Sequence, residues 1–175
     1  MAKLPDPVYN LIPPEADVLH AEVESFDFAD PPIDPVLLAS DLHYCMAQAG
    51  GIGLSANQVG LSHRVFVVNC EPALTVYNPV ITWYDDNYSV MEEGCLSYPG
   101  LSVKVRRPEK IRIRFQDEKG ETHTHKFDGL MARICQHEYD HLQGIDFTER
   151  ASPLNLKRAK EKLKKLQRKM KRKVA

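Results

Sequence analysis

Apolar side chains recur at helical spacing between Asp34 and Gly50, at Leu38, Leu42, Cys45, Met46 and Ala49. Repeats of three and four residues are typical of an amphipathic helix. Asp34 is a suitable N-cap and Pro35 suits the first turn. Gly50 and Gly51 follow the last apolar position and indicate where this helix ends.

Two further segments have helical periodicity. Asp128 is a candidate N-cap for a helix that runs to Leu142, with Gly144 as its stop. One face of this helix carries Leu130, Ile134, His137 and His141. Near the end of the chain, a narrow apolar seam of Leu156, Ala159, Leu163, Leu166 and Met170 crosses an otherwise basic segment. We expect this last helix to dock along the body of the protein rather than to lie inside it.

Other segments have the patterns of strands. Residues 64–69 form one strand-like stretch, and residues 74–83 form another that is broken by Asn78-Pro79. Residues 111–115 alternate with period two, and a turn at 117–120 can pair them with residues 121–127 as a hairpin with one face on the core. The first 35 residues hold seven of the twelve prolines, which predicts an extended lead-in on the surface. Strands interrupted by a few helices, without a repeating rhythm, indicate an α+β fold.

Charged residues are distributed unevenly along the chain, although the net charge of the 175 residues is only -1. Residues 157–175 hold 11 of the 23 Lys and Arg residues and one acid, Glu161, so they carry +10, which leaves -11 on the residues before them. We therefore expect one domain over residues 1–153 and a basic amphipathic helix over residues 154–175.

The apolar segments and the cysteine content of the chain predict its cellular location and the redox state of its thiols. No run approaches the roughly 20 apolar residues of a membrane span, and the first residues lack the apolar stretch of a signal peptide. These features predict a cytoplasmic protein that does not contact membranes. Four cysteines without a C-x-x-C pair are too few for a disulfide scaffold, and we expect reduced thiols.

The clearest chemical pattern is H-E-x-x-H at residues 137–141. Because four residues make about one helical turn, both imidazoles point the same way and can bind one cation. Glu138 then stands beside them as a base for an activated water. Composition alone gives roughly a 2% chance of such a match in this chain, so the pattern indicates a metal site without identifying a reaction.

A catalytic metal of this kind needs a third protein ligand. No His follows His141, and the later acids are Asp146, Glu149 and Glu161. Cys95, in the glycine-flanked segment 92–97, is another candidate, although a lone cysteine is more often a small buried apolar residue. His123 and His125 share a strand face, where a solvated hairpin is the simpler interpretation.

A glycine-rich segment, Gly51-Ile52-Gly53-Leu54-Ser55-Ala56-Asn57-Gln58, precedes the first predicted strand. A nucleotide-binding loop is disfavoured because Ala56 stands in place of a third glycine and the segment follows a helix rather than a strand. The better interpretation is a backbone that runs close to a substrate. It ends in the Gln58 amide, which can donate to a developing negative oxygen.

Three segments together resemble the motifs of the peptide deformylase family, in the family's order: GIGLSANQ at 51–58, EGCLS at 93–97 and QHEYDHLQG at 136–144. The resemblance spans residues 34–150. It implies that Cys95, His137 and His141 bind the metal and that Glu138 is the general acid and base. It also implies that Gln58 and the Leu96 N–H donate to the oxyanion. We count Gly53 of the same glycine-rich segment among the catalytic residues.

The resemblance also implies an activity, a metal and a partner. The activity is removal of the formyl group from formyl-methionine at the start of nascent polypeptides, with release of formate. The native metal is Fe(II), which Zn(II), Ni(II) or Co(II) can replace. Our candidates for the substrate pocket are Ile52, Met91, Gly94, Leu130 and Ile134. We further expect mixed or antiparallel sheets around a central metal-binding helix, a monomer, and a ribosome contact through residues 154–175.

The chain departs from the family's pattern in places. Ser55 replaces the usual alanine, and after Cys95 the first arginine is Arg106. Two rival functions remain. A generic H-E-x-x-H peptidase would leave the Cys95 and Gln58 motifs unexplained. A non-catalytic, ribosome-associated homologue would have lost a metal ligand or Glu138, and none of these residues is missing.

Overall fold

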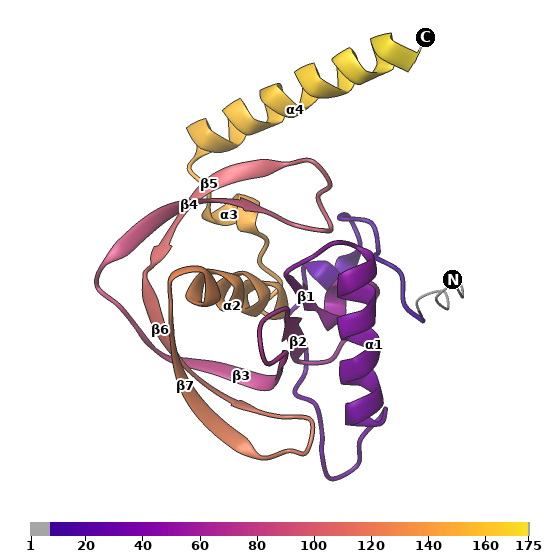
Figure 1. The fold of residues 1–175 in the computed structure, drawn as a ribbon, viewed down its shortest axis with the longest axis vertical. Coiled ribbons are helices and arrows are strands. Elements are labelled where there is room, and N and C mark those ends of the chain that lie inside the picture. Colours follow the sequence, from indigo (N-terminus) through magenta and orange to yellow (C-terminus); the bar gives the residue numbers. More distant parts are fainter. Residues whose placement is uncertain (1–7, 175) are drawn as a thin grey trace.

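A computed structural model describes residues 8–174 and shows two antiparallel sheets around one helix (Figure 1). The larger sheet has the order β1-β2-β3-β6-β7, and the smaller sheet pairs β4 with β5. The strands are β1 (Gly53–Ser55), β2 (Val65–Val68), β3 (Leu74–Tyr84), β4 (Tyr88–Gly94), β5 (Ser102–Pro108), β6 (Lys110–Gln116) and β7 (Thr122–Asp128). Helix α2 (Gly129–Leu142) lies between the sheets. This arrangement confirms the predicted α+β class.

Strand β2 explains why helices cover both faces of the larger sheet. All four of its residues are buried, and alternate side chains of a strand point to opposite faces. Val65 and Val67 pack in a cluster with α1 (Pro35–Gln48), whereas Phe66 and Val68 pack in a cluster with α2. The continuous apolar run in the sequence is therefore a strand between two helices.

The first two of the three predicted helices form with nearly the expected bounds. The Asp34 carboxylate accepts a hydrogen bond from the Leu37 N–H and caps α1, as expected. Asp128 occupies the N-cap position of α2, but its side chain makes no capping hydrogen bond. Gly144, with φ of 70°, follows α2 as predicted.

Strand β3 differs from the prediction because it continues through Asn78-Pro79. Its pairing with β6 shifts register between Tyr77 and Val80. Asn78 has φ of 47°, a left-handed conformation that asparagine tolerates better than most residues. Its side chain also bonds the backbone N–H and carbonyl of Phe26. The sequence feature taken as a break is thus a β-bulge that holds the N-terminal segment.

The N-terminal lead-in follows the surface, but it is anchored by buried side chains. Residues 1–7 lie outside the described part of the chain. From residue 8 to Asp34 the only helical element described is the short 3-10 helix η1 (Asp17–Leu19). Leu19, Val23 and Phe26 are each 3% exposed and insert into the core.

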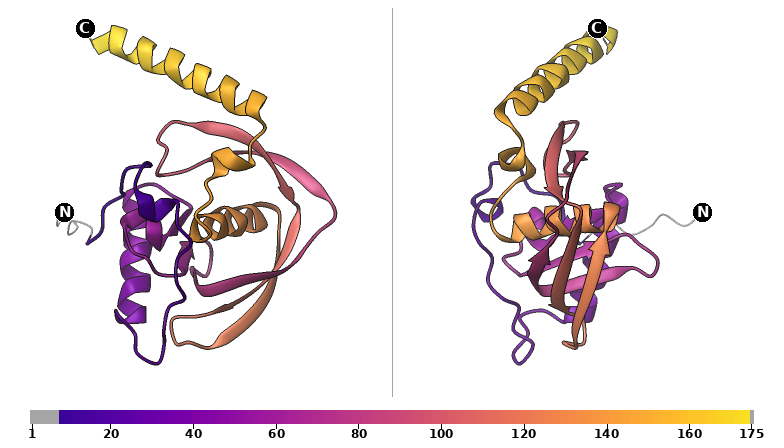
Figure 2. Two further views of the ribbon diagram at one scale, coloured as in Figure 1. Left: turned by 180° about the vertical axis from the view of Figure 1, so that it is seen from behind. Right: turned by 90° about the vertical axis from the view of Figure 1, so that its left-hand side faces the viewer.

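The basic helix α4 (Pro153–Val174) docks with only its first half. Leu156, Ala159 and Leu163 pack on a small cluster formed by β5 and the short helix α3 (Phe147–Arg150). Further along the same seam, Leu166 is 48% and Met170 67% exposed. Both views in Figure 2 show the helix extending beyond the body, so the helix docks on the body as expected, but only through its first half. None of the described helices is long and apolar enough to span a membrane.

Candidate active site

Helix α2 and the turn after β4 bring together a thiol and two imidazoles. His137 and His141 are one turn apart on α2, and both are buried. Cys95 follows the last residue of β4, and its Sγ lies 3.2 Å from His141 Nε2. The ligand atoms of Cys95, His137 and His141 all lie within 4.8 Å of one another. One soft sulfur and two imidazoles are a donor set that suits a catalytic divalent metal.

The orientation of the two imidazoles favours metal binding. His137 Nδ1 lies 3.1 Å from Glu93 Oε2, which leaves Nε2 free to face Cys95. This carboxylate–histidine contact is typical of metal sites, where it sets the ring orientation. Burial and the nearby His137 lower the pKa of His141 to about 3. The His141 ring is therefore neutral at physiological pH. Burial lowers the pKa of His137, but contacts with Cys95 and Glu93 outweigh it and raise that pKa to about 10, so the His137 ring must release a proton when it binds a metal.

The two acids that follow closely in the sequence have other partners. The Asp146 carboxylate accepts hydrogen bonds from the Thr148 N–H at 2.6 Å and from the Tyr98 hydroxyl at 2.8 Å. Glu149 accepts from the Asp146 N–H and completes a capping box at the start of α3. Both carboxylates thus stabilise a helix end, and neither is grouped with the two histidines as a candidate metal ligand.

Glu138 is a buried carboxyl group beside the cluster. Its Oε2 atom has no hydrogen-bond partner among the described residues. Burial raises its pKa to about 7, although His137 opposes the shift. Gly53 of β1 lies against this side chain: an added Cβ would overlap Glu138 Oε1 and come within 2.9 Å of Ile134. The glycine therefore leaves the room that the carboxyl group occupies.

Gln58 of the 3-10 helix η2 (Ala56–Val59) faces the cluster from the opposite side. Its Nε2 donates to Cys95 Sγ at 3.2 Å and to Ser97 Oγ at 3.0 Å. Its Oε1 accepts from Ser55, so the NH2 end of the amide is the one that points at Cys95. The Leu96 N–H donates to no acceptor within the described residues. Both groups can donate to an oxygen held near the cluster.

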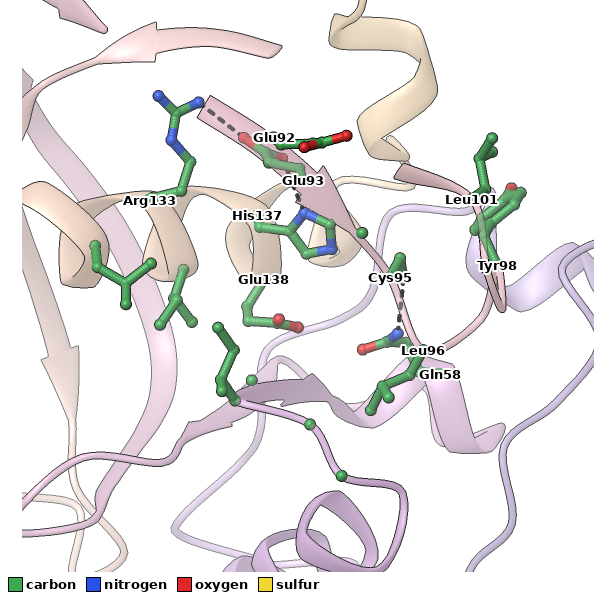
Figure 3. A pocket seen from close by; sticks show the side chains of 18 residues that line it. Gln58, Glu92, Glu93, Cys95, Leu96, Tyr98, Leu101, Arg133, His137 and Glu138 are labelled. Carbon is green, nitrogen blue, oxygen red and sulfur yellow. Dashed lines mark hydrogen bonds and ion pairs between the residues drawn. The ribbon is translucent and has the colours of Figure 1, made fainter. Parts of the chain in front are cut away.

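One cavity of about 420 Å³ is lined by Gln58, Cys95, Leu96, His137 and Glu138, among other residues (Figure 3). Figure 3 shows Glu138 extending from α2 and Gln58 pointing toward Cys95. Of the five residues expected in the substrate pocket, four line this cavity: Ile52, Gly94, Leu130 and Ile134. Met91 lies earlier on β4, half-buried, and is not among the lining residues.

Sequence reasoning did not anticipate the buried charges behind His137. Glu93 accepts hydrogen bonds from Arg107 Nε at 2.7 Å and from Arg133 Nη1 at 2.8 Å. Arg107 also donates to Asp140 at 2.6 Å, and Arg150 donates to the same carboxylate at 2.7 Å. Exposed and buried residues alternate along β5, and Arg107 follows Val103 and Val105 as the third buried position. That alternation is the one signal in the sequence that could have indicated an internal arginine.

The Glu93 network makes stability depend on pH. Burial opposes ionisation of Glu93, but the bonds to His137, Arg107 and Arg133 outweigh it and hold the pKa far below the usual 4.5. A carboxyl group with a lowered pKa stabilises the fold above its unfolded pKa and loses that contribution as pH falls. Glu93→Gln should cost about 3–5 kcal/mol at pH 7 because it leaves buried arginines unpaired.

The same argument predicts that the difference in unfolding free energy between wild-type and Glu93→Gln narrows as pH falls from 5 to 3. Urea denaturation of the metal-free proteins measures this difference. Glu92→Gln, at an exposed neighbouring position, is the matched control and should follow wild type. A difference that stays constant over this pH range would contradict the assignment.

The other candidate residues lie away from the cavity. His123 Nε2 contacts Asp117 Oδ2 at 2.8 Å on the β6–β7 hairpin, and His125 is exposed there. Asp117, Glu121 and His123 are close enough to hold a cation, but Asp117 is already bonded within the turn. Cys45 and Cys135 are buried in separate apolar clusters, as expected.

A thiol, two imidazoles, a buried carboxyl and an amide around one cavity define a metal-dependent hydrolase. Comparison with known proteins identifies the family. The sequence profile of the family described as Polypeptide deformylase matches residues 8–157. "Peptide deformylase 1" of Burkholderia multivorans is 40% identical over 163 residues, covering 88% of this chain and 90% of that protein.

Comparison with solved structures identifies the same family. The peptide deformylase of Synechococcus elongatus in complex with actinonin has a TM-score of 0.83 and 35% identity, covering 92% of this chain and 88% of that one. A plant peptide deformylase has a TM-score of 0.83 and 32% identity, covering 98% and 96%. The chain belongs to the polypeptide deformylase family. Its function is the metal-dependent removal of the formyl group from nascent polypeptides.

Proposed function

We propose that Cys95, His137 and His141 hold one divalent metal, with Fe(II) as the native ion and Zn(II), Ni(II) or Co(II) as replacements. The observation that carries this proposal is the convergence of their ligand atoms beside the cavity. A metal bound there would act as a Lewis acid toward the formyl carbonyl and would lower the pKa of a water. Glu93 keeps the His137 ring oriented for this purpose through Nδ1.

Glu138 acts as the general base and then as the general acid of the reaction. Its carboxylate takes a proton from the attacking water and then passes it to the leaving amine of the peptide. A pKa of about 7 suits both steps at neutral pH, because the group can accept and release a proton with little cost. Glu138 lines the cavity, and its Oε2 atom has no hydrogen-bond partner among the described residues, so the carboxyl group is available for this role.

The Gln58 amide and the Leu96 N–H stabilise the charge that develops on the formyl oxygen. Gln58 Nε2 already lies 3.2 Å from Cys95 Sγ, and Ser55 keeps the amide oxygen turned away. Fixed donors of this kind act most strongly in the transition state, where the oxygen is negative. They therefore lower the barrier more than they strengthen substrate binding.

The proposed substrate is the formyl-methionine end of a nascent chain. Ile52, Leu130 and Ile134 provide apolar surface for the methionine side chain, and Gly94 exposes backbone where an extended peptide can pair with the strand end. We retain Met91 as a residue that supports this wall from β4. Formyl is preferred over acetyl through steric exclusion, because a methyl group changes binding by only about 1–3 kcal/mol.

The test of substrate class compares formyl-Met-Ala-Ser with acetyl-Met-Ala-Ser on the Fe(II)-loaded protein. We expect formate release from the first and almost no turnover of the second. Cleavage of the Met–Ala bond would instead support the generic peptidase. Absence of any turnover would support the non-catalytic homologue.

We also propose that the chain is a cytoplasmic monomer in which residues 1–153 are the catalytic domain. The second half of α4 then provides a contact with ribosomal RNA. This half of the helix extends away from the body (Figure 1), and its Lys and Arg residues between positions 165 and 172 are exposed and can meet phosphates.

A chain that ends at residue 164 tests the α4 contact, because it keeps Leu156, Ala159 and Leu163 on the body and removes six of the eleven basic residues. We expect an unchanged unfolding midpoint and unchanged turnover of short peptides. Ribosome binding, measured by co-sedimentation across salt concentrations, should weaken and become less salt-dependent. Equal binding by the shortened chain would refute this contact.

A further inference from the structure

Ser55 is a buried hydroxyl that the family resemblance does not account for, since the usual residue at this position is alanine. It is the last residue of β1 and the N-cap of η2, and it is fully buried. Its Oγ lies 3.1 Å from Gln58 Oε1, and its backbone N–H donates to the same oxygen at 3.0 Å. The backbone N–H and the hydroxyl of Ser55 therefore both lie within hydrogen-bonding distance of the Gln58 amide oxygen, and the same hydroxyl also interacts with the Glu138 carboxyl group.

These contacts complete the hydrogen bonding of the Gln58 amide. Its oxygen accepts two hydrogen bonds from Ser55, and its nitrogen donates one to Cys95 Sγ and one to Ser97 Oγ. An amide group offers two donor hydrogens and two acceptor lone pairs. Every one is used in a place that excludes water, since Gln58 is 1% exposed.

We propose that Ser55 is a positioning residue that strengthens Gln58 as the oxyanion donor of this enzyme, an inference that rests on the function proposed above. The backbone N–H alone sets which way the amide faces. The hydroxyl fills the second lone pair of Oε1, and a hydrogen bond at one end of an amide polarises the other end. The Nε2–H group that contacts Cys95 Sγ in this structure thereby becomes a better donor when it turns to the formyl oxygen. An alanine here would leave that lone pair buried and empty.

The effect should appear in kcat rather than in KM. The substrate oxygen is nearly neutral in the bound state and negative in the transition state, so a stronger donor acts mainly in the latter. Loss of one neutral hydrogen bond corresponds to a fall of about 3- to 10-fold. We therefore expect Ser55→Ala to lower kcat by this factor and to leave KM within about twofold.

A matched pair of variants isolates the hydroxyl from changes in packing. Ser55→Thr and Ser55→Val have nearly the same shape, and only threonine keeps the donor. Threonine should therefore retain more activity than valine by the same 3- to 10-fold factor. Thermal unfolding of each variant reports whether the extra methyl groups disturb the fold, and the ratio between the two remains informative even when they do.

Two measurements decide the mechanism. In a Gln58→Leu background, which itself should lower kcat by about 100- to 1,000-fold, Ser55→Ala should have no further effect. In the Zn(II)-loaded protein, Ser55→Ala should also shift the side-chain N–H resonances of Gln58, identified by their loss in Gln58→Leu. An equal loss in both backgrounds, or unchanged kcat and resonances in Ser55→Ala, would overturn the proposal. Failure of the wild-type protein to release formate would instead overturn the proposed function.

Discussion

Glu138→Gln should lower kcat by about 100- to 10,000-fold and leave the bound metal in place. The substitution keeps the size of the side chain next to Gly53 and removes only its ability to exchange a proton. General acid–base catalysis contributes a factor of this order when one group moves the proton. Because Glu138 is not among the proposed ligands, metal content should stay at the wild-type value.

Formate release under anaerobic Fe(II) loading measures this loss, and elemental analysis of the same sample measures the metal. Glu121→Gln changes an exposed carboxyl near the distant β6–β7 hairpin and serves as the matched control. We expect it to behave as wild type. A fully active Glu138→Gln protein would show that the proton is carried by another group.

Cys95→Ala should release the metal and abolish turnover together. Only two imidazoles would then remain, one of them anchored by Glu93. Loss even of a residue that merely supports a ligand weakens metal binding by about 10- to 100-fold, so loss of the thiolate itself should weaken it further. Equilibrium dialysis against a metal-sensitive dye measures the affinity directly, without reference to catalysis.

A second cysteine provides the control for Cys95→Ala. Cys70 is half-buried at the end of β2 and packs at the edge of an apolar cluster, where its thiol bonds the Pro72 carbonyl. Cys70→Ala should therefore retain one metal per chain and full activity. Metal binding that survived in Cys95→Ala and failed in Cys70→Ala would mean that the site had been assigned to the wrong thiol.

Local patterns predicted the parts of this fold that depend on neighbours in the sequence. The α1 periodicity, the Asp34 cap and the β6–β7 hairpin each rest on contacts within a few residues, and each is confirmed. The pairing of His137 with His141 is likewise a property of one helical turn. The placement of Cys95 beside them required the family resemblance, because 42 residues separate it from His137 and no periodicity links the two.

Local sequence patterns could not predict contacts between segments that are distant in the sequence. Glu93 and Arg107 form a buried ion pair across β4 and β5, two strands that the sequence analysis did not predict. The Asn78-Pro79 pair predicts a break in the strand. In the fold, however, the Asn78 side chain accepts a hydrogen bond from the Phe26 N–H, which is distant in the sequence. For α4, the seam continues evenly to Met170, but the body that it packs against ends near Leu163.

The central claim is that Cys95, His137, His141 and Glu138 form one deformylating centre. Its most direct test incubates the anaerobic, Fe(II)-loaded protein with formyl-Met-Ala-Ser and quantifies formate and free Met-Ala-Ser together. We predict equal amounts of the two products from wild type, in proportion to bound metal, and none above background from Cys95→Ala. Formate release that does not depend on the metal, or release of a fragment cut at Met–Ala, would contradict this account.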